Sequence, residues 1–391
     1  MRTPEDGLYA ALRQRGISRR ALLRFSAAMA AVLALPATYA PRIAAAVAAA
    51  PRMPVVWLRG QDCGGNSQAL FRASKPTMAE LLLDVLSLEY HETLMAAGGA
   101  DATRARLDAM ERYPDGYIAV VEGAIPRGAA GAYCTLGGRA FEDVVREVCD
   151  GAQATIAVGS CAFDGGAPGA AGGSTGAVGA GDVVGTDRLV NLPGCPVNVE
   201  NLAATIVHLI ATGALPPSDG KGRPLFAYGS LVHNECERRP HYEYGEFALA
   251  WGDEGAQKGW CLYKLGCKGP ETFANCATVR YGEGTSWSIK AGHGCIGCTM
   301  PAFWDSMGPA YARLPALTPF TPGLTADQAG MALVGGIAVL TVAHGGASVI
   351  RAKLARRGAQ RHKASDGPPP QPPAPPPDAA SEGPDAVEAG A

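Results

Sequence analysis

The sequence predicts an α/β protein in which a parallel-sheet domain precedes a loop-rich, cysteine-containing domain and one C-terminal membrane helix. Three observations support this. Short apolar runs alternate with amphipathic stretches, six of the eleven cysteines lie within positions 233–298, and positions 329–350 contain no Asp, Glu, Lys or Arg. The 391 residues suffice for two domains with separate cores. A net charge of −2 gives no sign of nucleic-acid binding, so we expect no nucleic-acid partner.

Residues 1–50 are predicted to be a twin-arginine signal region. Ser18, Arg19 and Arg20 precede an apolar, alanine-rich stretch at 25–40, and small residues continue to Ala50. An N-terminal membrane anchor is the alternative, although the apolar core is short for a span. We therefore expect the twin-arginine export machinery to be a partner and to carry the folded chain outwards.

Residues 51–228 are predicted to form the sheet domain. Helix patterns cover 77–88, 141–148 and 199–210. Short apolar runs with strand character lie at 55–58, 117–121, 155–158, 189–192 and 225–228. Alternation of this kind indicates a parallel α/β sheet of the flavodoxin-like type.

Three cysteines and one glutamate follow the carboxyl ends of these strands. They are Cys63, Glu122, Cys161 and Cys195. Open α/β sheets bind ligands in the crevice at this edge, so we expect the side chains to converge. Any one of these cysteines alone would be read as a small buried hydrophobe. We read Cys149 as helix core and Cys134 as a structural thiol near the site, neither of them as a ligand.

The second domain, residues 229–320, carries two further groups of soft ligands. His233, Cys236, Cys261 and Cys267 make four, and Cys276, Cys295 and Cys298 make three. These are the ligand counts of a cubane iron–sulfur cluster and of a cluster lacking one iron. Structural zinc and disulfides stay open from spacing alone, although the odd number of cysteines disfavours complete pairing.

Three phrases in this region, HNECERRPHYEYGEF, KGWCLYKLGCKGPETFANC and EGTSWSIKAGHGCIGC, resemble the small, electron-transferring subunit of membrane-bound, uptake-type [NiFe]-hydrogenases. The resemblance covers residues 55–314. It implies an oxidoreductase complex in which a separate large subunit oxidises H2 at a nickel–iron site. Electrons would then pass through three clusters of this chain to a membrane cytochrome b and the quinone pool.

The resemblance also implies a role for each ligand. Cys63, Cys161 and Cys195 would hold a proximal [4Fe-4S] cluster, and Cys276, Cys295 and Cys298 a medial [3Fe-4S] cluster. His233, Cys236, Cys261 and Cys267 would hold a distal [4Fe-4S] cluster. Asp62 and Glu122 are candidates for proton handling or cluster tuning, with structural hydrogen bonding as the equal alternative.

The sequence departs from the family pattern beside the proximal group. Asn66 stands where most members have the second cysteine of a C-x-x-C motif, and an amide oxygen is a poorer iron ligand than a thiolate. Three outcomes are open: Asn66 ligates weakly, the fourth iron takes water or a side chain such as Glu122, or the cluster has three irons. Oxygen-tolerant members carry extra cysteines where this chain has Gly65 and Gly166.

The medial loop shows a second departure. Ser288 occupies a position where many relatives have proline. Its hydroxyl could offer an oxygen to a fourth iron, but a simple loop hydroxyl is the favoured reading, so we retain a three-iron medial cluster.

Residues 329–350 are predicted to cross the membrane. Arg351, Lys353, Arg356 and Arg357 follow, which by the positive-inside rule leaves the C-terminus cytoplasmic and the main domains on the periplasmic side. Residues 351–391 are predicted to be a basic, then proline-rich, disordered tail. A hydrogen-sensing or assembly-type subunit with a decayed proximal site is the alternative function. Sensing relatives generally lack an export signal and a membrane helix.

Overall fold

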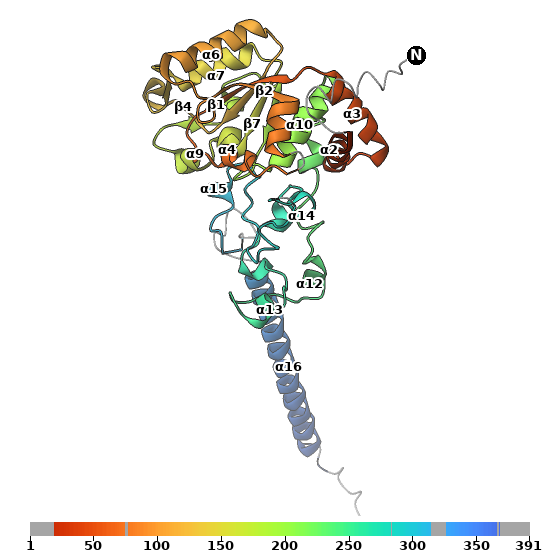
Figure 1. The fold of residues 1–391 in the computed structure, drawn as a ribbon. Coiled ribbons are helices and arrows are strands. Elements are labelled where there is room, and N and C mark those ends of the chain that lie inside the picture. Colours follow the sequence, from red (N-terminus) through yellow and green to blue (C-terminus); the bar gives the residue numbers. More distant parts are fainter. Residues whose placement is uncertain (1–18, 75–76, 283, 314–325, 366, 368–391) are drawn as a thin grey trace, which may run out of the picture. The chain divides into compact units, whose positions relative to one another are not determined.

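The computed structural model describes residues 19–74, 77–282, 284–313, 326–365 and 367. The chain forms two compact units, Met1–Leu314 and Pro315–Ala391. The first contains the sheet and both groups of soft ligands in the loop-rich part, and the second contains one long helix. Figure 1 labels the elements.

A five-stranded parallel sheet forms the centre of the first unit, in the order β2-β1-β3-β7-β9. The five strands are β1 (Met53–Arg59), β2 (Leu86–His91), β3 (Ile118–Glu122), β7 (Ala154–Val158) and β9 (Leu189–Leu192). Numbered among themselves, they follow the flavodoxin order 2-1-3-4-5. The predicted fold class is therefore confirmed. Two antiparallel pairs are added: β4 (Ile125–Pro126) with β8 (Ala177–Val178), and β5 (Thr135–Leu136) with β6 (Arg139–Ala140).

Helices cover both faces of the sheet because successive strand residues point to opposite sides. On β1, Val55 and Trp57 belong to one core, whereas Val56 and Leu58 belong to the other. The second core is closed by α6 (Gly99–Arg112) and α7 (Phe141–Asp150), and the first by α4 (Gly65–Leu70) and α10 (Val199–Thr212) (Figure 1).

The first described residues form two helices, α2 (Arg19–Val32) and α3 (Ala40–Ala49), joined by the short η1 (Ala37–Tyr39). Both pack against α10. Their buried side chains include Leu22, Phe25, Met29, Ile43 and Val47. α10 has ten buried residues among its fourteen, because α2, α3 and α4 all pack against it. The part of the predicted signal region that the structure describes is thus helical and folded onto the sheet domain.

Two predicted elements are wrong. The helix expected over 77–88 is only α5 (Met78–Glu80) and a π-helical turn, η2 (Leu81–Val85), after which the chain enters β2. In β2 the side chains alternate, and pairing with β1 outweighs the helical pattern before it. The strand expected over 225–228 is the short helix α11 (Leu225–Tyr228), which begins after Pro224. The sheet ends at β9, and the chain turns away.

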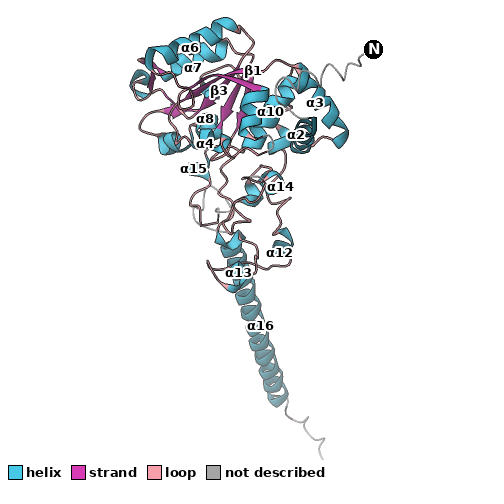
Figure 2. Cartoon of the chain, viewed as in Figure 1, coloured by secondary structure: helices cyan, strands magenta, loops and turns pink. Residues whose placement is uncertain are grey.

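Loops dominate the described residues between α11 and α16, as predicted (Figure 2). The helices in this part are single turns: α12 (Arg239–Glu243), α13 (Glu254–Gln257), η6 (Tyr263–Leu265), η7 (Gly269–Glu271), α14 (Cys276–Val279) and α15 (Phe303–Ser306). In such short helices many backbone N–H groups have no carbonyl acceptor within the helix, so they can donate to side chains instead.

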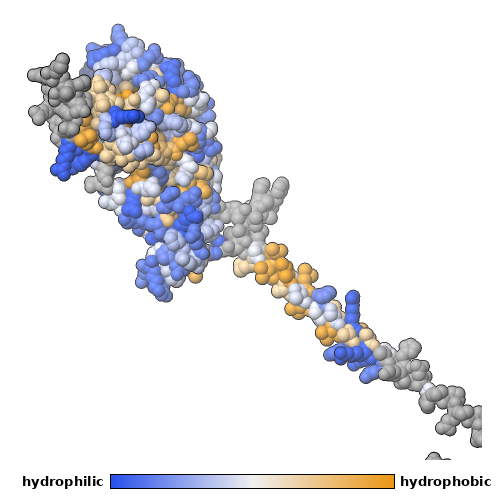
Figure 3. All heavy atoms as spheres, turned by 90° about the vertical axis from the view of Figure 1, so that its right-hand side faces the viewer, coloured by the Kyte–Doolittle hydropathy of each residue, from blue (hydrophilic) through white to orange (hydrophobic). Residues whose placement is uncertain are grey.

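The second unit contains α16 (Ala326–Ser365). Its segment Gly330–Gly358 is long and apolar enough to cross a membrane. The apolar side chains along it are exposed, and hydrophilic ones gather towards its carboxyl end (Figure 3). The helix contains the predicted span 329–350 and continues through the basic residues that follow. Apart from residue 367, the predicted proline-rich tail lies outside the described residues.

Candidate functional site

The structure brings Cys63, Cys161 and Cys195 together at the carboxyl edge of the sheet. Cys63 follows β1, Cys161 lies in the first turn of α8 (Gly159–Asp164) directly after β7, and Cys195 follows β9. Burial, with the nearby charges of Cys195 and Cys63, raises the pKa of Cys161 to about 11. The three thiols therefore lie within electrostatic reach of one another, as the strand pattern predicted.

Gly65 and Gly166 lie beside these thiols. A Cβ atom at Gly65 would be 3.1 Å from the Sγ of Cys63. One at Gly166, in α9 (Gly166–Gly169), would be 2.9 Å from the Sγ of Cys161, at a backbone φ of +49°. Neither glycine supplies a sulfur.

Asn66 lies in the first turn of α4, and its side chain joins two of the cysteine-bearing segments. Its Oδ1 accepts a hydrogen bond of 2.8 Å from the backbone N–H of Val197, two residues after Cys195. The amide also fills the space above Gly159, where a Cβ would be 2.4 Å from Nδ2. Asn66 is 7% exposed, so its side-chain amide is buried. The hydrogen bond from Val197 to this amide is here named the Asn66 latch.

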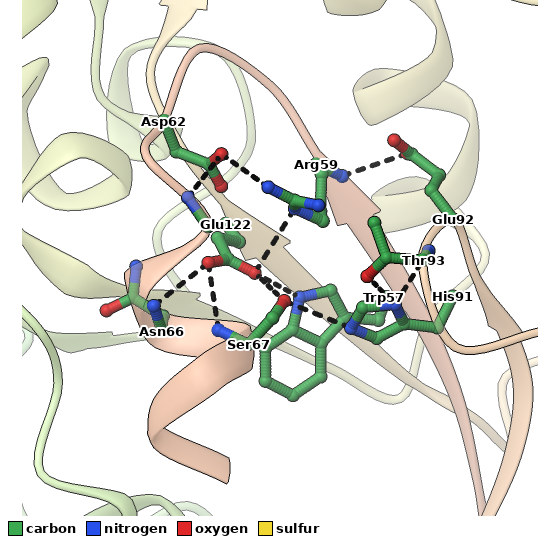
Figure 4. A network of polar contacts seen from close by, with 10 residues as sticks. Trp57, Arg59, Asp62, Asn66, Ser67, His91, Glu92, Thr93 and Glu122 are labelled. Carbon is green, nitrogen blue, oxygen red and sulfur yellow. Dashed lines mark hydrogen bonds and ion pairs between the residues drawn. The ribbon is translucent and has the colours of Figure 1, made fainter. Parts of the chain in front are cut away.

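Glu122, at the end of β3, is fully buried and accepts hydrogen bonds from four donors (Figure 4). The backbone N–H groups of Asn66 and Ser67 donate to Oε1 at 3.1 and 3.0 Å. The Nε1 of Trp57, at 2.9 Å, and the hydroxyl of Ser67 donate to Oε2. Burial raises the pKa of Glu122, and the bonds from Ser67 oppose that rise. An environment made only of donors suits the carboxylate form.

His91, at the end of β2, extends this network. Its Nδ1 accepts the backbone N–H of Thr93 at 3.2 Å, so the neutral ring carries its proton on Nε2. That Nε2 lies 3.1 Å from the Ser67 hydroxyl, which itself donates to Glu122. Burial lowers the pKa of His91 to about 4, so the ring is neutral near pH 7. The chain of donors runs from His91 through Ser67 to Glu122.

Asp62 lies beside the same network but does not touch Glu122. It accepts from the guanidinium of Arg59 and from the backbone N–H of Gly64, at 2.8 and 3.0 Å. Arg59 also approaches Glu122, with Nε 3.7 Å from Oε2. A single guanidinium thus stands between the two carboxyl groups that the sequence singled out.

The four-ligand group lies in the loop-rich part of the first unit. His233, Cys236, Cys261 and Cys267 line one small, enclosed cavity. Burial, and secondarily Arg239, lowers the pKa of His233, which favours the neutral imidazole that can act as a ligand. Burial raises the pKa of Cys261 to about 11, with Cys267 and Cys236 close enough to contribute.

The three-ligand group lines a larger cavity of about 570 Å³. Cys276, the first residue of α14, shares it with Cys295, Cys298 and Ser288. Burial raises the pKa of each of the three thiols to about 12. Ionising them in a buried site therefore requires a compensating positive charge, which iron supplies.

The three groups form a continuous row. The hydroxyl of Ser160, next to Cys161, donates to the backbone oxygen of Cys298 at 2.5 Å. At the other end of the three-ligand group, the N–H of Cys295 donates to the Sγ of Cys267 at 3.3 Å. The three-ligand group therefore lies between the other two.

Several observations fit clusters better than single ions. All eleven cysteines are unpaired. Among the described residues, no three His, Cys, Asp or Glu side chains converge tightly enough for one metal ion, so these ligands suit a group several atoms across. The indole Nε1 of Trp287 is buried on the wall of the medial cavity without a hydrogen-bond partner among the described residues, and a cluster sulfide could accept from it.

Backbone donors complete the fit. N–H groups of Arg238, Gly269 and Gly297 point at the sulfurs of Cys236, Cys267 and Cys295, each at 3.4 Å. Hydrogen bonds of this kind stabilise cluster thiolates and raise cluster potentials.

Sequence reasoning missed the residues that support Glu122, namely Trp57, Ser67 and His91. The alternation of β2, which ends on His91, was the available signal. Cys149 is core in α7, as expected, and Cys134 packs at the edge of the same core.

Two family models match the chain. Residues 63–209 match the NADH ubiquinone oxidoreductase 20 kDa subunit, and residues 228–311 match the C-terminal part of the NiFe/NiFeSe hydrogenase small subunit. The chain is 41% identical to an uptake hydrogenase small subunit of Azotobacter vinelandii, with 88% of this chain and 96% of that protein aligned. The chain belongs to the [NiFe]-hydrogenase small-subunit family.

Other members of the family agree. A quinone-reactive Ni/Fe-hydrogenase small chain of Wolinella succinogenes is 42% identical, with coverage of 85% of this chain and 96% of that protein. Among solved structures, a [NiFeSe]-hydrogenase of Desulfomicrobium baculatum is 35% identical, covers 68% of this chain and 100% of its own, and gives a TM-score of 0.63. Hydrogenase small subunits pair with a large subunit that holds the active site, and they carry iron–sulfur clusters.

Proposed function

We propose that this small subunit conducts electrons from H2 oxidation in the large subunit, through three iron–sulfur clusters, to a membrane cytochrome b and the quinone pool. The continuous row of thiols carries the proposal. Its sheet-edge group is linked to the middle group through Ser160, and the middle group to the last through Cys267. When bound, the clusters supply one-electron redox chemistry.

The proposed ligand sets follow the three groups. Cys63, Cys161 and Cys195 hold the proximal [4Fe-4S] cluster and Cys276, Cys295 and Cys298 the medial [3Fe-4S] cluster. The distal [4Fe-4S] cluster is held by His233, Cys236, Cys261 and Cys267. We propose that Asn66 keeps its bond to Val197 and leaves the fourth proximal iron to water or another ligand.

The surroundings of the ligands suit the proposed clusters. Backbone N–H groups point at Cys236, Cys267 and Cys295, and burial lowers the pKa of His233, which favours its neutral form. Beside the proximal group, the Ser67 hydroxyl and the backbone N–H groups of Asn66 and Ser67 hold the carboxyl group of Glu122 at the end of β3. A fixed negative charge there lowers the tendency of the neighbouring centre to accept an electron.

We further propose that twin-arginine export places the main domains on the periplasmic side, with the C-terminus of α16 cytoplasmic. Arg19 and Arg20 begin α2, and Arg351, Lys353, Arg356 and Arg357 end the apolar part of α16. The double change Arg19→Lys and Arg20→Lys should leave the precursor in the cytoplasm, as fractionation would show.

A hydrogen-sensing or assembly role is the second candidate, and the missing thiolate at Asn66 favours it. The long apolar helix α16 favours the respiratory role, because a membrane helix brings the chain close to membrane electron carriers.

Spectroscopy of the anaerobically isolated complex tests the proposal. Iron quantification with EPR and Mössbauer spectra should show three clusters, one of them a three-iron centre. Cys298→Ser should remove or convert the three-iron signal, whereas Cys149→Ser, a buried thiol of the core, should leave all signals unchanged. Two clusters in the unmodified complex would mean that one site is empty and would refute the conduit.

A further inference from the structure

Lys268 is buried between the distal and medial ligand groups. It follows Cys267 directly, is 1% exposed, and its backbone N–H donates to the oxygen of Cys295 at 2.7 Å. Its hydroxyl-bearing neighbour Thr272 bonds the Lys268 carbonyl at 2.6 Å. Both the N–H and the carbonyl group of Lys268 are therefore hydrogen-bonded, and the N–H is bonded to the medial ligand Cys295.

The ammonium end of Lys268 is held by three carbonyl oxygens. Nζ donates to Gly266 at 3.0 Å, to Pro309 at 3.1 Å, and to Ala312. Three acceptors call for three N–H donors, which an ammonium has and a neutral amine lacks. The arrangement is thus built for the charged form.

Residues 309–312, here named the strap, supply two of these carbonyls. The strap lies so close to the distal loop that a Cβ on Gly266 would meet the backbone carbon of Tyr311 at 2.5 Å. The contact excludes water from the amine, so the charge of Lys268 is little screened.

Negative groups surround this cation. Lys268 directly follows Cys267, and its backbone N–H bonds the carbonyl oxygen of Cys295, so one distal and one medial ligand lie beside it. Glu271, in η7, has a buried Oε2 without a hydrogen-bond partner among the described residues. The site therefore pairs one buried cation with ligands of two clusters and one carboxyl group.

We propose that Lys268 is a fixed positive charge that raises the reduction potentials of the medial and distal clusters together. This inference rests on the proposed ligand sets. Each added electron makes a cluster more negative, and an unscreened cation nearby stabilises that reduced state. Because the same ammonium acts on both centres, it keeps their potentials in step and favours electron passage away from the large subunit.

The test uses the complete membrane-bound complex and compares Lys268→Met with Lys258→Met. Lys258 is a surface lysine of the same part of the chain, with its side chain 57% exposed. Potentiometric titration followed by EPR gives the midpoint potentials of the three-iron centre and of the distal four-iron centre. We expect both to fall in Lys268→Met and neither to change in Lys258→Met, where solvent screens the charge. Lys268→Arg keeps a positive charge at this position, so both potentials should stay close to those of the unmodified complex.

Glu271→Gln provides a measurement of opposite sign and does not depend on the folding of Lys268→Met. Because burial raises the pKa of Glu271, the titration is carried out at about pH 8, where removing its negative charge should raise both potentials. Unchanged or raised potentials in Lys268→Met, or lowered potentials in Glu271→Gln, would overturn the inference. Absence of both EPR signals from the unmodified complex would instead refute the proposed function.

Discussion

Asn66→Ala should destabilise the small subunit because it removes the only acceptor described for a buried backbone donor. The N–H of Val197 bonds Oδ1 of Asn66 at 2.8 Å, and Val197 is fully buried. A buried donor left without a partner costs about 1–3 kcal/mol. For a unit of this size, that corresponds to a fall in Tm of roughly 2–5 °C.

Differential scanning calorimetry of the purified heterodimer measures this fall. Gln68→Ala, an exposed change on the same helix α4, is the matched control and should leave the Tm unchanged. Asn66→Asp keeps an oxygen in place for Val197 and should retain the Tm. If Asn66→Ala were as stable as the unmodified protein, the hydrogen bond from Val197 would contribute nothing to stability. The amide would then be free to act as an iron ligand.

Asn66→Cys separates the latch from ligation. The thiol is a weak acceptor for the Val197 N–H, so the Tm should fall as it does for the alanine variant. The added thiolate should convert the proximal site to four-thiolate ligation and lower its potential, because the site gains negative charge. An unchanged proximal spectrum would show that position 66 does not face the iron.

Three further outcomes are expected. Glu122→Gln should lower stability by about 1.5–3 kcal/mol, because hydrogen bonds to a charged acceptor are lost and the new amide N–H₂ faces donors; an unchanged Tm would contradict this. The pKa of His91 is about 4 in the folded chain and 6.5 ordinarily, so the folded state resists protonation. Its contribution to stability is full above about pH 6.5 and is lost as the pH falls towards 4, by up to about 3 kcal/mol. Tm–pH curves should be shallower for His91→Asn. Gly266→Ala should detach the strap, because its Cβ would meet the backbone of Tyr311 at 2.5 Å with φ at +89°. Limited proteolysis should then cut the strap faster than it does in the control Gly259→Ala. At Gly259 the φ is similar, but an added Cβ would meet open space.

The sequence was sufficient for the fold class because four of the five strands are short apolar runs without competing patterns. It failed at residues 77–88, where a helical face runs without a break into the alternating Leu86–His91, and only pairing with β1 separates the two. It failed again at 225–228, since four apolar residues suit a strand or a helical turn equally well. In both cases the deciding interaction lies far away in the chain.

The candidate site was accessible for a different reason. Soft ligands are rare residue types, so their order along the chain already indicated which of them belong together. The supporting residues were not accessible in this way. His91 and Ser67 are 24 residues apart, and Ser67 and Glu122 are 55 apart. His91, Ser67 and Glu122 share no sequence motif. They meet only because β2 and β3 end beside α4 in the folded chain.

The arrangement of the backbone explains why the medial group lies in the middle of the row. Cys295 donates its N–H to the sulfur of the distal Cys267 and offers its carbonyl oxygen to the N–H of Lys268. Three residues later, the carbonyl oxygen of Cys298 accepts the hydroxyl of Ser160, which precedes the proximal Cys161. One short loop therefore touches the ligand loops of both neighbours. In the proposed electron path, a shift of this loop towards one neighbour would loosen its hydrogen bond to the other, so the distances from the medial cluster to the two flanking clusters would change together.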